Sequence, residues 1–139
     1  MKIGIINGVN LNLLGLRETH IYGTQVFDDF FTRLRAEFAD TELHYAQHNE
    51  ESKYIEQIQQ WGRELDGLIV NPGAWSHQSL AIADALRSSA APVIEVHISA
   101  VHQREVYRQT LITGAGCKGV ISGLGLQGYR VAIWHLIHT

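Results

Sequence analysis

The chain is predicted to be a single α/β domain with a flavodoxin-like, three-layer α/β/α fold around a five-stranded parallel sheet. Two observations predict this class. Short β-branched runs alternate with helical hydrophobic patterns along all 139 residues. Five strands in so short a chain favour the strand order 2-1-3-4-5, with helices on both faces of the sheet. We therefore expect residues 1–139 to form one domain.

The expected strands are the apolar runs at residues 3–6, 43–46, 67–70, 92–96 and 119–122. Hydrophobic spacing predicts helices at 26–39, after Asn49, at 79–87, around 102–107 and around 129–136. Asn49 is the expected N-cap of the second helix, and Ser76 is a candidate cap for the third. The segment 8–25 is long for a connection in an α/β domain, so we expect it to be a mobile active-site lid.

Composition limits the partners and the location. The net charge is −3 and the eleven Lys and Arg residues are scattered, which argues against nucleic acid. The apolar start, residues 1–7, is too short for a signal peptide or a membrane span, so we expect a cytoplasmic protein without a membrane partner. Cys117 is the only cysteine, which fits a reducing compartment.

Polar residues follow the strands at the edge where parallel sheets bind ligands: 7–10, 71–73 and 97–99. Glu95 and His97 lie two positions apart on one strand and therefore share a face. A buried carboxylate needs a partner, so Glu95 is expected to orient His97 as a general acid or base; the alternative is a structural pair closing a strand end. His77 is expected to enter the same cleft, although plain turn chemistry also explains this neighbouring segment.

Three other patterns are discounted. Gly123–Gly128 matches G-x-G-x-x-G but follows the last strand, where tight turning and close packing explain the glycines. His44 and His48 do not share a helical face, so they predict no metal site. Lys2, Lys53 and Lys118 are not expected near the cleft, which argues against a Schiff base. The competing hypothesis is a binding module for FMN or a phosphate ligand at the same strand ends.

Four segments, 7–23, 71–85, 95–108 and 119–129, together carry most of these polar residues. In content, order and spacing they resemble the type II 3-dehydroquinate dehydratase (type II dehydroquinase) family over nearly the whole chain. The resemblance implies a hydro-lyase that converts 3-dehydroquinate to 3-dehydroshikimate through an enolate, with no metal, cofactor or Schiff base. Both aromatic amino acid biosynthesis through shikimate and quinate breakdown use this reaction, and the sequence fits either.

The resemblance also implies catalytic roles. Tyr22 is the implied base, and Arg17 would hold it as a phenolate, since a nearby cation lowers the pKa of a phenol from about 10. His97, oriented by Glu95, is the implied general acid for the departing hydroxyl. Asn10 is implied to stabilise the enolate through a water molecule.

Substrate binding is implied for a second set: Asn71, Ile98 and Ser99 for the carboxylate, His77 and Arg108 for the ring hydroxyls, and Asp84 from a neighbouring subunit. Asp84 enters because the family assembles trimers into a dodecamer. The sequence departs from the family's usual Pro, Pro, Gly and Asn at Val9, Thr19, Ser52 and Ala100, respectively. The last change removes a polar group beside the expected carboxylate site.

Overall fold

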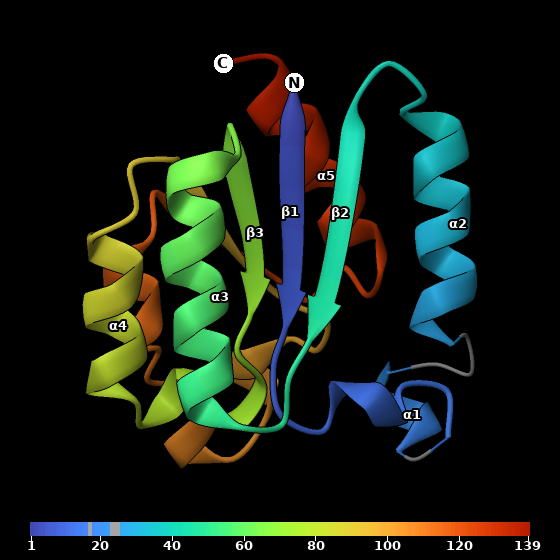
Figure 1. Ribbon diagram of the computed structural model, residues 1–139. Helices are drawn as coiled ribbons and strands as arrows, with labels where there is room; N and C mark the ends of the chain where they lie inside the picture. The colour runs from blue at the N-terminus through green and yellow to red at the C-terminus, as the bar shows by residue number, and fades with distance from the viewer. Residues whose placement is uncertain (17, 23–25) are drawn as a thin grey trace.

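The computed structural model describes residues 1–16, 18–22 and 26–139, without the side chain of Tyr22. The sheet is formed by β1 (Lys2–Asn7), β2 (Glu42–Gln47), β3 (Gly67–Asn71), β4 (Val93–His97) and β5 (Gly119–Ser122). All neighbouring strands pair in parallel, in the order β2-β1-β3-β4-β5 (Figure 1). The predicted fold class and strand order are therefore confirmed.

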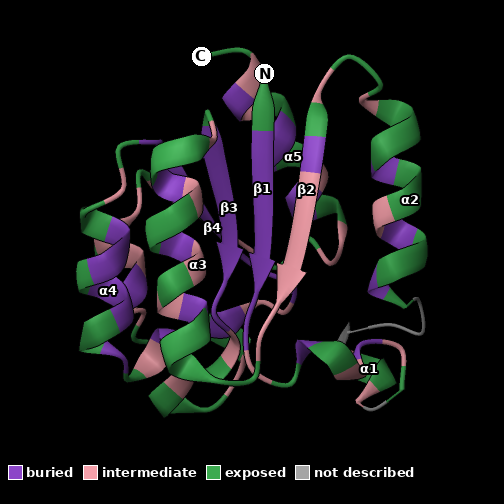
Figure 2. Ribbon diagram, in the orientation of Figure 1, coloured by how far each residue is buried: buried purple, intermediate pink, exposed green. Residues whose placement is uncertain are grey.

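Helices cover the sheet on both sides. The first apolar core lies between the sheet and the helices α2 (Phe27–Glu37) and α5 (Gln127–Ile137). The second lies between the sheet and the helices α3 (Glu51–Glu64) and α4 (Leu80–Arg87). Figure 2 shows why the central strands read as unbroken apolar runs: β1 and β3 are buried along nearly their whole length, while the edge strand β2 is largely half-buried.

Two predicted helix caps are wrong. Helix α3 follows Glu50, which makes no side-chain cap bond. Asn49 does not cap the helix, because its side chain accepts a hydrogen bond from the loop after β1. Helix α4 is capped by Ser79, whose Oγ accepts a hydrogen bond from the Ile82 backbone N–H at 3.0 Å. Ser76 lies within a 3₁₀ helix and donates to the Gly73 carbonyl.

The helix expected around residues 102–107 is also wrong. The segment between β4 and β5 contains three short 3₁₀ helices: η3 (Val101–Gln103), η4 (Val106–Arg108) and η5 (Thr113–Gly116). Residues 102–107 contain only two apolar residues, Val106 and Tyr107, which are adjacent and give no helical hydrophobic face. Gly116 lets η5 approach α4 closely, because an added Cβ would lie 2.7 Å from the Ala83 carbonyl oxygen.

The predicted lid, residues 8–25, contains the 3₁₀ helix η1 (Leu11–Leu13) and the short helix α1 (Thr19–Tyr22), at the carboxyl end of the sheet (Figure 1). Arg17, residues 23–25 and the Tyr22 side chain lie outside the described residues. The mobility of the lid stays a prediction. Within the described ranges, no helix has both the length and the apolar character needed to cross a membrane.

Candidate active site

The turns after β1 and β3 cross in close contact, and glycine makes the crossing possible. The Gly8 backbone N–H donates to the Asn71 carbonyl at 2.7 Å, and a Cβ on Gly8 would lie 2.5 Å from the Pro72 carbonyl oxygen. Gly73 has φ +64°, and a Cβ there would lie 2.8 Å from the Val9 carbonyl oxygen. The two turns thus form one rigid wall at the carboxyl end of the sheet.

Asn10 is held in this wall from the side of β2. Its backbone has φ 67°, in the left-handed region that Asn tolerates. Its N–H donates to Asn49 Oδ1 at 2.9 Å, and Gln47 Nε2 donates both to Asn49 Oδ1 at 3.0 Å and to the Gly8 carbonyl at 3.1 Å. Gln47 and Asn49, at the end of β2, therefore position Asn10, a predicted catalytic residue.

A cavity of about 110 Å³ lies in front of this wall. Seven of the predicted site residues line it: Asn10, Asn71, His77, His97, Ile98, Ser99 and Arg108. Its other lining residues are Val9, Leu11, Leu13, Leu14, Glu18, Gly73, Ala74, Val101 and Arg104. The topology thus brings residues from the loops after β1, β3 and β4 to one place, as predicted for the strand ends.

Glu95 and His97 form the expected pair on β4. His97 Nε2 lies 2.8 Å from Glu95 Oε2, and the Glu95 side chain is fully buried behind the cavity. The second carboxylate oxygen, Oε1, accepts a hydrogen bond from the Thr113 hydroxyl. Because the Thr113 hydroxyl occupies Oε1, Oε2 is placed to accept a hydrogen from His97 Nε2, and Nδ1 is then the ring nitrogen left for proton exchange.

His77 reaches the same cavity from η2 (Gly73–His77), with its ring centroid 6.3 Å from that of His97. Its Nδ1 lies 2.9 Å from the Thr110 carbonyl oxygen, which can only accept, so Nδ1 carries the hydrogen. Burial lowers the pKa of His77; the hydrogen bond to Thr110 opposes this shift, and the neighbouring His97 and Arg108 add to it. Neutral His77 therefore has a bare Nε2, which can accept a hydrogen bond.

Two arginines give the cavity positive charge. Arg108 Nε lies 2.9 Å from Glu105 Oε2, without the alignment of a hydrogen bond, and its guanidinium carbon is 5.3 Å from the Tyr107 ring centroid. Arg104 Nη1 donates to Ser99 Oγ at 3.4 Å. An anionic ligand suits this end of the cavity.

A buried network joins the ends of β1 and β3 to α5. The Tyr129 hydroxyl donates to Asn7 Oδ1 at 2.8 Å and accepts from Asn71 Nδ2 at 2.9 Å. Asn71 Oδ1 in turn accepts from the Gly73 N–H at 3.1 Å. Asn71 lines the cavity as predicted, and these bonds fix the orientation of its amide.

Other predicted residues lie elsewhere. Asp84 is on the solvent side of α4, 79% exposed and 3.3 Å from Arg87, and does not line the cavity of its own chain. Arg17 and the Tyr22 side chain lie outside the described residues. Ala100 lines a neighbouring hollow beside Gly123, and this hollow shares Ile98, Ser99 and Arg104 with the cavity.

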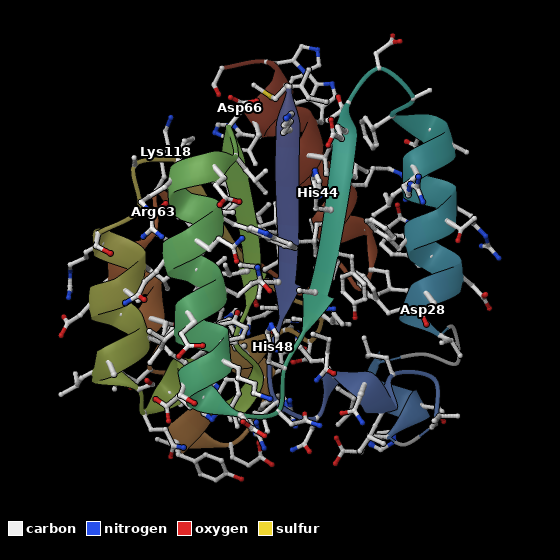
Figure 3. The ribbon with its side chains drawn as sticks, in the orientation of Figure 1. Asp28, His44, His48, Arg63, Asp66 and Lys118 are labelled. Carbon is white, nitrogen blue, oxygen red and sulfur yellow. The ribbon has the colours of Figure 1, made fainter. Side chains whose placement is uncertain are left out.

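The discounted motifs are placed as the sequence indicated. Gly123 and Gly125 have positive φ, and Gly128 packs on β4, where an added Cβ would lie 3.0 Å from Val96 Cγ1. His44, on β2, contacts Glu42, whereas His48, just after the end of β2, contacts Gln57, and the two histidines lie apart (Figure 3). Across the described ranges, no group of three or more His, Cys, Asp or Glu residues is placed to hold a metal ion.

All three lysines are exposed and none lines the cavity. Lys118 lies toward the opposite end of the sheet from the loops that carry the site (Figure 3). The absence of a suitably placed lysine, expected from the sequence, therefore holds in the structure.

Sequence reasoning missed Thr113, Arg104 and the Gln47–Asn49 pair as site residues. Arg104 had a signal, because a cation five residues after Ser99 lies close to a strand end that binds ligands. Thr113 and Asn49 had none, since Thr113 meets Glu95, and Asn49 meets Asn10, only in the fold.

Known proteins resemble this chain over its whole length. The family model described as dehydroquinase class II matches residues 1–137. A protein named 3-dehydroquinate dehydratase 2 from Agrobacterium fabrum is 48% identical over 136 residues, with 96% of this chain and 92% of that protein covered. A 3-dehydroquinate dehydratase from Helicobacter hepaticus is 46% identical, with 99% and 89% covered.

Solved structures agree. The crystal structure of a type II dehydroquinase from Butyrivibrio crossotus matches with a TM-score of 0.94 and 42% identity, and one from Propionibacterium acnes with 0.95 and 39%. In both cases 99% of this chain and 97% of the other are covered. The chain belongs to the class II dehydroquinase family.

Proposed function

We propose that the chain is a hydro-lyase that dehydrates 3-dehydroquinate to 3-dehydroshikimate, with Tyr22 as base and His97 as general acid. Family membership supports the reaction. The observation that carries the mechanism is the Glu95–His97 pair: a buried carboxylate 2.8 Å from an imidazole that lines the cavity.

The reaction has two steps. The base takes the proton from the carbon next to the ketone, and the electron pair moves to the ketone oxygen as an enolate. The enolate then reforms the ketone, the carbon–oxygen bond of the hydroxyl two carbons from the ketone breaks, and water leaves with a proton from His97 Nδ1. Because Glu95 accepts the hydrogen on Nε2, it would orient the ring so that Nδ1 can give a proton to the departing hydroxyl.

The other tyrosines make poor bases, which supports Tyr22. Burial raises the pKa of Tyr45 to about 12 and also raises the pKa of Tyr54 and of Tyr129. Tyr107 is exposed and does not line the cavity. Tyr22, five residues after Arg17, would be ionised by that guanidinium when the lid closes over substrate.

The cavity walls suit a small polyhydroxylated anion. Its carboxylate would lie against Asn71, Ile98 and Ser99, where Arg104 supplies a positive charge. The bare Nε2 of His77 would accept from a ring hydroxyl, and Arg108 would donate to another. Asn10 would stabilise the enolate oxygen through a water molecule.

Asp84 would complete the site of a neighbouring subunit in a dodecamer formed by four trimers. Its exposure on α4, away from its own cavity, supports a role toward a second copy of the chain. A cytoplasmic location stays a prediction from the sequence. The alternative of an FMN-binding module has less support, because the family match extends over residues 1–137.

The test is to add 3-dehydroquinate to the purified protein and follow the ultraviolet absorbance of the conjugated product. Turnover should be unchanged by a chelator, and borohydride with substrate should not inactivate the enzyme. Absence of product, with FMN bound instead, would establish the alternative. Activity lost to the chelator and restored by metal, or substrate trapped on a lysine, would overturn the mechanism while keeping the reaction.

A further inference from the structure

Thr113 lies at the start of η5, in the segment between β4 and β5, and is fully buried. Its hydroxyl donates to Glu95 Oε1, on the side of the carboxylate that faces away from His97. It lies eighteen residues from Glu95 in the sequence and does not line the cavity. Any effect on catalysis must therefore pass through Glu95.

The surroundings of Glu95 show why a second donor is needed. A carboxylate with no exposure to water is costly unless its oxygens are hydrogen-bonded. His97 satisfies Oε2 at 2.8 Å, and Thr113 satisfies Oε1. Gly114 allows the approach, because a Cβ there would lie 3.0 Å from Val120 Cγ2 and 3.5 Å from Glu95 Oε2.

We propose that Thr113 is a positioning residue for the general acid: its hydroxyl keeps the Glu95 carboxylate turned toward His97, so that His97 holds its hydrogen on Nε2 and presents Nδ1 to the substrate. The inference rests on the proposed function for its catalytic consequence. Its structural part, the effect on the His97 hydrogen bond, does not depend on any activity.

The same segment also fixes the second histidine of the cavity. The Thr110 carbonyl accepts from His77 Nδ1 at 2.9 Å, three residues before Thr113. The connection that lacks the expected α-helix thus sets the tautomers of both His77 and His97. This gives the irregular backbone at 110–114 a specific role in the site.

The decisive variants are Thr113→Val, which keeps the shape and removes the donor, and Thr113→Ser, which keeps the donor. A hydrogen bond to a charged group is strong enough that its loss should lower kcat by about 10- to 100-fold in Thr113→Val. KM should change by less than about twofold, because Thr113 does not touch the substrate. Thr113→Ser should keep kcat within about twofold of the natural enzyme.

Two further measurements separate positioning from a general loss of structure. The proton resonance of the His97 imidazole N–H, observed in protein with ¹⁵N-labelled histidine, should move in Thr113→Val and stay in place in Thr113→Ser. In a Glu95→Gln background, Thr113→Val should cost less than about twofold in kcat, because the carboxylate through which it acts is gone.

The proposal is overturned if Thr113→Val keeps its kcat and its His97 resonance, if Thr113→Ser loses as much kcat as Thr113→Val, or if the loss persists in full in Glu95→Gln. Should Thr113→Val fail to fold, Thr113→Cys replaces it; its weak S–H donor should give a kcat below that of Thr113→Ser, and a kcat equal to that of Thr113→Ser would overturn the proposal. An inactive natural enzyme would refute the proposed function, whereas the resonance comparison would still decide the role of Thr113.

Discussion

Replacing Tyr129 with Phe would remove one hydroxyl that joins two amide side chains beneath the cavity. That hydroxyl donates to Asn7 Oδ1 and accepts from Asn71 Nδ2, and the tyrosine is fully buried. Removing it leaves two buried amide groups without a partner, each at about 1–3 kcal/mol. We expect Tyr129→Phe to lower the free energy of unfolding by about 2–6 kcal/mol.

The activity should fall as well, because Asn71 lines the cavity and loses one of the bonds that orient its amide. A loss of about 1.4 kcal/mol in transition-state binding corresponds to a tenfold drop, so we expect kcat/KM to fall by about tenfold. Urea denaturation measures the first effect, and the absorbance of the conjugated product measures the second.

Tyr54→Phe is the matched control. Tyr54 is equally buried, but on the other face of the sheet, and its hydroxyl donates to the Ile6 backbone carbonyl at 3.0 Å. One partner is left unpaired, so we expect a loss of about 1–2 kcal/mol in stability and an unchanged kcat/KM. Equal stability losses in the two variants, with kcat/KM unchanged in Tyr129→Phe, would refute the role of this network in the site.

Three further predictions concern titration, the lid and assembly. Burial lowers the pKa of His77 in the folded protein, so just below the ordinary histidine pKa of about 6.5 the unfolded chain binds more protons than the folded chain. The free energy of unfolding should therefore fall as the pH drops through about 6.5. Urea denaturation repeated across pH should show a shallower fall in His77→Gln. Tyr22→Phe should abolish nearly all turnover, whereas Arg17→Ala should retain a residual kcat that rises toward alkaline pH as the unassisted phenol ionises; near-normal turnover in either variant would remove the proposed base. Light scattering should show a multiple of trimers, and Asp84→Ala should raise KM; a fully active monomer would contradict the shared site.

The sheet could be predicted from the sequence because its signal is local. Buried parallel strands leave continuous β-branched runs, and the alternation of side chains along β4 places Glu95 and His97 on one face without any tertiary information. The cavity residues at the ends of β1, β3 and β4 follow from the rule that parallel strands carry their ligands at one edge.

The rest depended on tertiary contacts that no local pattern encodes. Asn49 is of a residue type common at N-caps, but its side chain instead accepts hydrogen bonds from the Asn10 backbone N–H, thirty-nine residues away, and from Gln47 Nε2, two residues away. Thr113 reaches Glu95 across eighteen residues of backbone without helical or strand periodicity. Local propensity competes with such bonds, and at a functional site the tertiary contact decides the outcome.

The central claim is that His97 delivers a proton to the departing hydroxyl of 3-dehydroquinate. The most direct measurement is the steady-state rate of conjugated product formation by the natural chain and by His97→Ala, with the thermal midpoint of each sample recorded alongside. We expect product formation by the natural chain and a kcat about 10²–10⁴-fold lower in His97→Ala. A folded His97→Ala enzyme with undiminished kcat would contradict it.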